Sequence, residues 1–227
     1  MKYPSIQFSK EQAFSLERFR EMDYHAVNNF HLPIELMMEN AGLQLANFVA
    51  HQASIEQTIL IGVGNGNNGG GGLVAARRLA AWGYSVFIDS FTEITKEIPK
   101  SQLQRAIKFG AKVGIITKPN IWVDAYLGFS QKLPLRPALT DRLNKANSTT
   151  AIKISLDIPT GFLGNIQSPY FHANQVLTLA APKSLLYQLP ASTSIYIADI
   201  GIPKEVYALF GSKSLPFFKS NILSLNT

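Results

Sequence analysis

Short runs rich in β-branched residues alternate with stretches of helical periodicity, and this alternation limits the fold more than any other feature of the sequence. The expected strands are Thr58 to Val63, Tyr84 to Asp89, Lys112 to Thr117, Ile121 to Ala125, Ala151 to Leu156, Val176 to Ala180 and Ser194 to Ala198. Helical patterns lie between several of them, at residues 71–82, 99–109 and 138–147. Apolar strands separated by helices indicate an α/β fold in which a mostly parallel sheet is covered on both sides.

Two helices are expected before the first of these strands. Ser9 and Gln12 form a capping-box pattern, and apolar residues then recur at helical spacing, which predicts a helix over residues 9–29. Pro33 suits the first turn of a second helix. Gly42 lies inside the apolar stripe of that helix at a cost of about 1 kcal/mol relative to alanine, which indicates a close contact with a neighbouring element.

Composition excludes several classes of protein. The apolar fraction of 46% suffices for a large core and excludes a disordered chain. The sequence has no cysteine, which excludes disulfides, thiolate metal sites and a cysteine nucleophile, and suits a reducing compartment. The first residues lack a signal-peptide pattern, and no apolar run approaches the roughly 18 residues that span a bilayer. We expect one domain over residues 1–227, located in the cytoplasm without membrane contact.

The number and distribution of charged residues indicate which partners the protein could bind. The net charge of +6 comes from 21 Lys and Arg against 15 Asp and Glu, but the basic residues are scattered, so nucleic-acid binding is not expected. Charged residues make up 16% of the chain, well below the roughly 25% of ordinary domains. This deficit favours a surface covered by a partner, and a weakly charged monomer is the alternative.

Six glycines occur within residues 64–72, in the stretch Gly-Asn-Gly-Asn-Asn-Gly-Gly-Gly-Gly. The stretch directly follows an expected strand and directly precedes an expected helix. Glycines let the backbone approach a ligand closely, and the free N–H groups at a helix start attract an anion. The pattern therefore predicts a phosphate or nucleotide site, with a flexible connection as the alternative.

A nicotinamide-dependent dehydrogenase is a serious alternative function. Gly64, Gly66 and Gly69 satisfy the dinucleotide fingerprint, and Asp89 ends the next expected strand, where that fingerprint has a ribose-binding acid. Against this function, the paired asparagines and the further glycines are expected to delay the helix beyond the point where the fingerprint starts it.

Two acidic residues end apolar strands and precede glycine-containing loops. Asp124 is followed by Gly128, and Asp157 is followed by Gly161. Ligands of parallel sheets bind beyond the carboxyl ends of the strands, so these acids predict a pocket, although a strand-end acid can also act only as a cap. Asn68, Asp124 and Thr160 offer oxygens that suit a hard cation, and a single carboxylate favours a monovalent ion over magnesium.

Six motifs in fixed order resemble the NAD(P)H-hydrate epimerase family, also called the YjeF N-terminal domain, in its stand-alone form. They are Met38-Glu39-Asn40-Ala41-Gly42, Gly66-Asn67-Asn68-Gly69-Gly70, Val123-Asp124-Ala125 with Gly128, Asp157-Ile158-Pro159-Thr160-Gly161, Ala181-Pro182-Lys183 and Ala198-Asp199-Ile200-Gly201-Ile202-Pro203. The resemblance implies a Rossmann-like three-layer αβα sandwich, often a homodimer, that interconverts the R and S forms of hydrated NADH and NADPH. These damaged cofactors carry a hydroxyl on the ring carbon beside the nicotinamide nitrogen, and a separate dehydratase repairs only the S form.

The resemblance also implies the residues of the site. A potassium ion would be held by Asn68, Asp124 and Thr160, the last of which is serine in many members. The implied substrate contacts are Asn67, Asn68, Gly69, Gly70, Gly71, Gly128, Phe129, Ser130, Gln131, Lys132, Leu133, Pro134 and Asp157. Asp157 is the candidate catalytic residue, because the reaction needs a group that donates and accepts a proton.

Two departures from the family pattern motivate a further alternative. The family reads Asn-Asn-Gly-Gly-Asp-Gly, but this chain has Gly71 in place of the aspartate. After Gly161 the usual acidic stretch is replaced by Phe162-Leu163-Gly164-Asn165-Ile166. These changes would suit a nucleotide-binding module that has lost catalysis.

Overall fold

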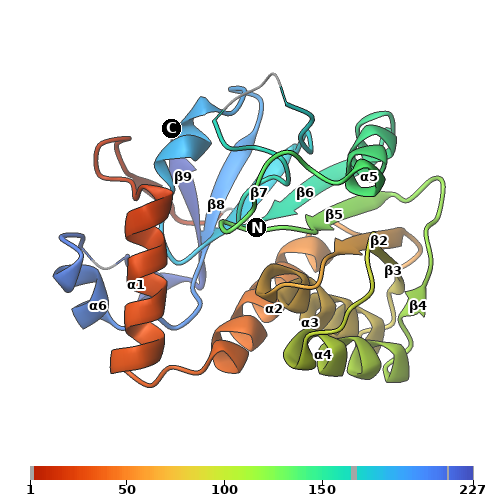
Figure 1. Cartoon of the computed structure of the whole chain (residues 1–227), viewed down its shortest axis with the longest axis horizontal. Coiled ribbons are helices and arrows are strands. Elements are labelled where there is room, and N and C mark those ends of the chain that lie inside the picture. The colour runs from red at the N-terminus through yellow and green to blue at the C-terminus, as the bar shows by residue number, and fades with distance from the viewer. Residues whose placement is uncertain (1–2, 165–167, 214, 227) are drawn as a thin grey trace.

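Nine strands form one sheet in the computed structural model, which describes residues 3–164, 168–213 and 215–226 (Figure 1). The strands are β1 (Ser5–Gln7), β2 (Thr58–Val63), β3 (Ser85–Ser90), β4 (Lys112–Val113), β5 (Ile121–Ala125), β6 (Ile152–Leu156), β7 (Gln175–Leu179), β8 (Ser194–Ala198) and β9 (Ile222–Asn226). Their order is β1-β9-β8-β7-β6-β5-β2-β3-β4. Only the β8–β9 pair is antiparallel among these strands, which confirms the mostly parallel sheet.

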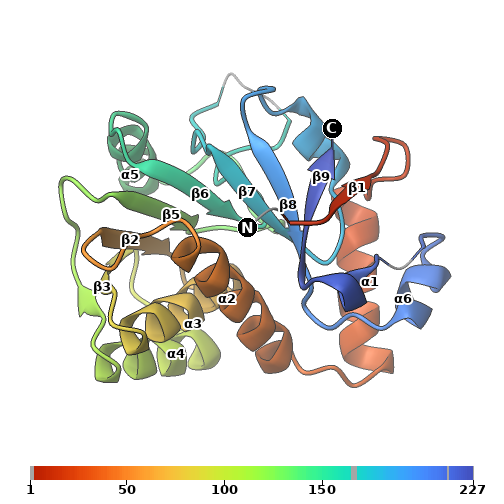
Figure 2. The same cartoon turned by 180° about the vertical axis from the view of Figure 1, so that it is seen from behind.

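Helices cover both faces of this sheet. They are α1 (Leu16–Asn29), α2 (Ile34–Ala50), α3 (Asn67–Ala81), α4 (Glu97–Lys108), α5 (Pro137–Asn147) and α6 (Lys204–Leu209), with short 3-10 helices η1 (Ser184–Gln188) and η2 (Phe217–Lys219). Helices α2, α3 and α4 lie together on one side of the strands and α5 lies on the other (Figures 1 and 2). This arrangement is the expected Rossmann-like three-layer αβα sandwich. Among the described residues, none of the helices has both the length and the apolar composition that crossing a bilayer requires.

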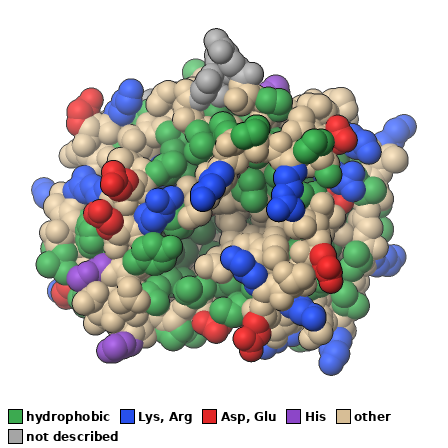
Figure 3. All heavy atoms as spheres, in the orientation of Figure 1, with side chains coloured by type: hydrophobic (Ala, Val, Ile, Leu, Met, Phe, Trp, Pro, Cys, Tyr) green, Lys and Arg blue, Asp and Glu red, His purple; other side chains and the backbone are tan. Residues whose placement is uncertain are grey.

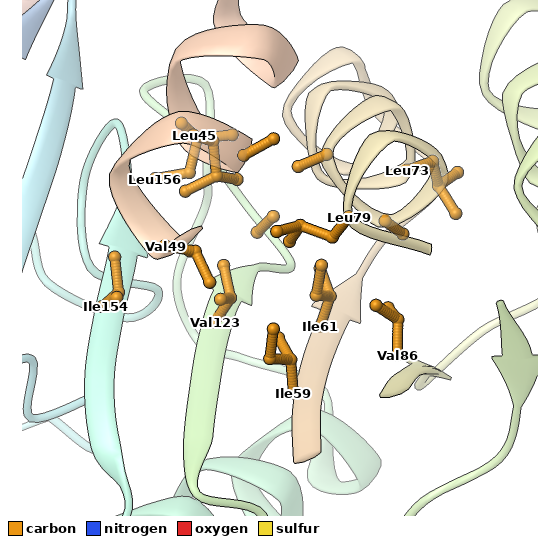
Figure 4. Close-up of a cluster of buried hydrophobic side chains, with 14 of the residues drawn as sticks. Leu45, Val49, Ile59, Ile61, Leu73, Leu79, Val86, Val123, Ile154 and Leu156 are labelled. Atoms are coloured by element: carbon orange, nitrogen blue, oxygen red, sulfur yellow. The ribbon is translucent and has the colours of Figure 1, made fainter. Parts of the chain in front are cut away.

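The main core fills the space between the sheet and helices α2 and α3 (Figure 4). Leu45 and Val49 of α2 and Leu79 of α3 point toward Ile61 of β2 and Val123 of β5. A second cluster on the opposite face joins β2 and β5 to α5. The central strands are therefore buried on both faces, as their unbroken apolar sequences predict. Each fully buried side chain of this kind contributes roughly 1.5–3 kcal/mol.

The first helix starts later than the sequence predicts. The capping box forms, because the Ser9 N–H donates to the Gln12 side chain at 2.9 Å, but it closes only a turn and does not begin the helix expected over residues 9–29. Phe14 interrupts that range, since its N–H donates to the carbonyl of Pro182 at 2.9 Å. This bond to a distant part of the chain draws the backbone into an extended conformation, and α1 begins after it.

The edges of the sheet also differ from the prediction. The strand expected at Lys112 to Thr117 is reduced to two residues, because Gly114 takes a φ of +145° and ends it. Strands β1 and β9 were not expected; they pair with each other, and β9 also pairs with β8. The remaining six strands agree with the predicted bounds to within one residue at each end.

Gly42 marks the predicted close contact, which is the crossing of α2 and α3. A Cβ atom at this position would lie 2.4 Å from the side chain of Val74 and 2.7 Å from the carbonyl oxygen of Gly71. Both distances are too short for any side chain. The glycine is therefore required by the lack of space between the two helices.

Gly42→Ala is expected to lower the free energy of unfolding by about 1–3 kcal/mol, because overpacking outweighs the gain of about 1 kcal/mol in helix propensity. Urea unfolding measures the change. Gly71→Ala is the matched control, since Gly71 also lies inside a helix and a Cβ there would come no closer than 3.3 Å, to the side chain of Leu156. A Gly42→Ala protein as stable as the control would contradict this account of the crossing.

Candidate active site

The order of strands reverses between β2 and β5, and this switch point is where an open parallel sheet binds ligands. A pocket with a volume of about 470 Å³ lies at the carboxyl ends of these strands and of β6, within the range of roughly 300–1,000 Å³ that is usual for small-molecule sites. Figure 3 shows a face of the molecule hollowed near its centre, with Lys and Arg side chains spread around the hollow.

Helix α3 begins at Asn67, so the glycine-rich stretch forms its first turns. The expectation that the helix would be delayed is therefore wrong, and it gives no argument against a dehydrogenase. The glycines at residues 64–72 have no positive φ. Several of them are required by close packing instead, since a Cβ at Gly69 would lie 2.0 Å from the carbonyl oxygen of Gly64 and one at Gly72 would lie 2.6 Å from the Cβ of Ala125. This packing brings the start of α3, with its unpaired N–H groups, to the pocket.

Asp89 is buried and bound to other side chains of the protein, and this is a separate argument against a dehydrogenase. It is 3% exposed, accepts a hydrogen bond from the Tyr126 hydroxyl at 2.7 Å and pairs with Arg142 at 3.0 Å. These partners occupy the carboxylate that the dinucleotide fingerprint would use for a ribose.

Asp124 is the most completely buried carboxylate near the pocket. It accepts hydrogen bonds from the N–H and hydroxyl of Thr160 at 2.8 and 2.6 Å, from the Ser155 hydroxyl at 3.0 Å and from the Tyr126 N–H at 3.3 Å. Burial raises the pKa of Asp124 to about 6, and these hydrogen bonds oppose the rise. Among the described residues no cationic side chain forms an ion pair with it.

The three predicted cation ligands belong to one hydrogen-bonded network. The Asn68 amide donates to the carbonyl oxygens of Leu127 at 2.9 Å and of Leu156 at 3.3 Å. The N–H of Leu127 in turn donates to the Thr160 hydroxyl, which donates to Asp124. A buried carboxylate that forms no ion pair among the described residues and is bonded to the Thr160 and Ser155 hydroxyls fits a monovalent cation. The four hydrogen bonds to Asp124 already use its acceptor positions, so a bound ion would replace some of them.

Asp157 follows β6 in a left-handed backbone conformation, with a φ of 69°. Such a conformation is unfavourable for a residue with a side chain, and it persists because the N–H of Asp157 donates to Leu177 at 2.8 Å. One carboxylate oxygen accepts the N–H of Phe129 at 2.9 Å, and the other pairs with Lys183 at 2.8 Å. The side chain is thus held in one position at the pocket wall.

Lys183 is a fully buried cation that sequence reasoning assigned no role. Besides Asp157, its ammonium group bonds the Thr178 hydroxyl at 3.0 Å and the carbonyl oxygen of Leu179, and it lies 3.7 Å from the centre of the Phe19 ring. Burial lowers the pKa of Lys183, while the neighbouring carboxylates raise it. A lysine in an otherwise apolar turn after a strand was the signal that could have identified it.

Asp23 on α1 was also missed. It lines the pocket together with Asp157. Burial and the negative charge of Asp157 raise the pKa of Asp23 to about 6, and Lys183 partly offsets this. The helical pattern of α1 could have indicated Asp23, because it lies beside Met22 and one turn after Phe19, both of which are buried.

The structure brings together most of the predicted substrate contacts. The pocket is lined by Asn67, Asn68, Gly71, Gly128, Phe129, Ser130, Gln131 and Asp157. The other predicted substrate contacts do not line it; these are Gly69, Gly70, Lys132, Leu133 and Pro134. Two of the predicted cation ligands, Asp124 and Thr160, are buried beneath the pocket. The Gln131 side chain is bonded to residues 159, 161 and 162, so it fixes the loop. Of the altered stretch after Gly161, Asn165 and Ile166 lie outside the described residues.

The fold and the pocket define a Rossmann-like α/β protein with a helix start and fixed carboxylates at its switch point. Residues 34–185 match the profile of the family described as YjeF-related protein N-terminus. The NAD(P)H-hydrate epimerase of Rhodopirellula baltica is 33% identical over 211 residues, which cover 86% of each chain. The chain therefore belongs to the YjeF-related protein N-terminus family.

Two further proteins extend the comparison. The bifunctional NAD(P)H-hydrate repair enzyme Nnr of Hyperthermus butylicus is 29% identical over 192 residues, which cover 77% of this chain and 36% of that protein. The crystal structure of yeast ynu0, YNL200c, has the same fold, with a TM-score of 0.86 and 24% identity, and the match covers 94% of this chain and 99% of that one.

Thr160→Val is expected to destabilise the protein by about 1–3 kcal/mol, because it leaves the Leu127 N–H without a partner and leaves one Asp124 oxygen with only the 3.3 Å hydrogen bond from the Tyr126 N–H. Thr160→Ser keeps the hydroxyl and is the matched control. Chemical unfolding compares the two, and equal stabilities would show that the hydroxyl does not support this network.

Proposed function

We propose that this protein is an NAD(P)H-hydrate epimerase, which interconverts the R and S forms of hydrated NADH and NADPH. Membership of the family and the relatives' names support this function. The observation that carries it is Asp157, a carboxylate fixed in a strained backbone position at a pocket that also holds the start of α3. A phosphate of the cofactor suits that helix start, and Lys96 also lines the pocket and offers a positive charge.

The reaction takes place at the ring carbon that bears the hydroxyl and adjoins the ring nitrogen. Protonation lets the hydroxyl leave as water, because the nitrogen lone pair stabilises the cation that forms. Water then returns to either face of the ring. Asp157 is the proposed catalytic residue that exchanges a proton with these oxygens, and its fixed carboxylate also favours the cationic ring.

We propose potassium as the cofactor. Asn68, Asp124 and Thr160 would hold it. The carboxylate of Asp124 supports that assignment, because it is buried and has no cationic partner among the described residues. A bound ion would supply positive charge beneath the pocket and fix the turns that follow β5 and β6.

The two alternatives from the sequence are not favoured. The dehydrogenase would need the carboxylate of Asp89 to bind a ribose, but Tyr126 and Arg142 already bind that carboxylate. The degenerate module rested on Gly71 and on the altered stretch after Gly161. Gly71 is buried and lies against Leu156 and Ala41. Although the family aspartate is absent there, Asp157 and Asp23 still line the pocket.

We also propose a functional link to a separate NAD(P)H-hydrate dehydratase and a homodimer in solution. Tyr24, Phe30 and Leu36 are 55%, 39% and 54% exposed, and they supply apolar surface around the junction of α1 and α2. Light scattering distinguishes a dimer from the 25.0 kDa monomer.

The cysteine-free composition supports a cytoplasmic location.

The wild-type protein is expected to accelerate consumption of R-hydrated NADH when a dehydratase specific for the S form is present. Asp157→Asn should lower the enzyme-dependent rate by about 100-fold or more, the usual scale of general acid–base catalysis. Asp141→Asn, an exposed position on α5, is the matched control. Wild-type protein that adds nothing to spontaneous epimerisation would contradict the proposed function, and NADP+ binding without acceleration would favour the degenerate module.

Replacing choline chloride by potassium chloride at equal ionic strength is expected to raise the Tm, because a ligand of the folded state stabilises it by mass action, about 2.7 kcal/mol at 100 times Kd. Asp124→Asn should remove the difference. Identical melting curves of the wild-type protein in both salts would rule out the potassium site.

A further inference from the structure

The carboxylate of Asp23 lines the pocket but has no part in the reaction as proposed so far. Asp23 reaches the site from α1, whereas Asp157 reaches it from the end of β6. Phe19 lies one turn before Asp23 on the same helix face. Its ring contacts the ammonium group of Lys183 and packs edge-on against Phe129, with ring centres 5.1 Å apart. These contacts fix the face of α1 that presents Asp23 to the pocket.

Lys183 itself cannot act on a substrate. It is fully buried, donates hydrogen bonds to the Thr178 hydroxyl and to the carbonyl oxygen of Leu179, and forms an ion pair with Asp157. It is a positioning residue that holds the Asp157 carboxylate in place.

The pocket therefore combines two carboxylates with one buried cation. The charged groups that face Asp23 are Asp157 after β6 and Lys183 after β7. Because the buried Lys183 is paired with Asp157, the carboxylate of Asp23 has no equivalent partner. Consistent with this, burial and Asp157 raise the pKa of Asp23 to about 6. Two carboxyl groups with different environments are the usual basis for a division into acid and base.

We propose that Asp23 is a second catalytic residue, which acts with Asp157 so that one carboxyl group gives a proton to the departing hydroxyl and the other takes a proton from the returning water. This assignment rests on the proposed epimerase function. It adds to Asp157 a proton donor from a different element of the fold.

Asp23 gives its proton to the hydroxyl oxygen, the C–O bond breaks with its electron pair on that oxygen, and water leaves. The ring nitrogen's lone pair forms the C=N bond of the cation. A solvent water then forms a new C–O bond, the C=N electrons return to nitrogen, and the water's extra proton passes to Asp157. Transfer of that proton back to Asp23, through solvent, resets the pair.

Asp23→Asn in the full chain tests this assignment in the coupled assay with R-hydrated NADH. We expect a fall in kcat of about 100-fold or more, with NADP+ affinity changed by less than about threefold. Glu21→Gln is the matched control, because it removes the same charge from the exposed side of the same helix. An Asp23→Asn protein with the kcat of this control, while Asp157→Asn is inactive, overturns the second catalytic carboxylate and leaves the epimerase intact.

Chemical rescue separates catalysis from a structural role. Formate added to Asp23→Ala is expected to restore the rate by about tenfold or more, since a small carboxylic acid can replace the missing side chain, and to leave Glu21→Gln unchanged. A folded Asp23→Ala protein that formate does not rescue contradicts the proposal. If the wild-type protein itself does not accelerate epimerisation, the proposed function and this inference are both overturned.

Discussion

The pocket depends on the carboxylate of Asp124, which ties together the ends of β5 and β6. Its hydrogen bonds to Thr160 and Ser155 join the turn after β6 to the end of β5. The Thr160 hydroxyl then reaches Leu127, and Leu127 reaches Asn68 at the start of α3. Three elements from distant parts of the chain are thereby fixed relative to one another. A carboxylate can do this without a cationic partner only because every acceptor position is satisfied.

A second buried carboxylate, that of Asp157, is stabilised in a different way. It pairs with Lys183, and removing one partner from a buried pair of this kind costs about 3–5 kcal/mol. The lysine in turn depends on Thr178 and Leu179 at the end of β7. The protein thus buries an ion pair to hold one carboxylate at the pocket wall, which is typical of a functional site.

The sequence predicted the sheet well where the signal was local. Six strands and four of the helices follow from apolar runs and helical periodicity, and Asp124 and Asp157 were found because acids at parallel strand ends meet at one edge. Features set by distant contacts were not predicted. The start of α1 depends on the bond between Phe14 and Pro182, and β1 and β9 become strands only by pairing with each other and with the sheet edge.

The same division holds within the site. Asp23 occurs on an ordinary amphipathic helix, and nothing in its local sequence shows that this helix packs over the strand ends. Lys183 was noticed only as part of a motif, since burial of a lysine depends on partners from β6 and β7. The reason for several of the glycines was also hidden from the sequence, because only the packing around α3 shows that no space is left there for a side chain.

A crystal structure of the protein with NADP+ bound tests the central claim most directly, which is that the switch-point pocket takes the nicotinamide cofactor beside Asp157. We expect the nicotinamide ring within hydrogen-bond or single-water reach of the Asp157 carboxylate. We also expect a phosphate group at the N–H groups that begin α3. A nucleotide whose ribose displaces Arg142 or Tyr126 from Asp89, with its ring away from Asp157, would contradict it.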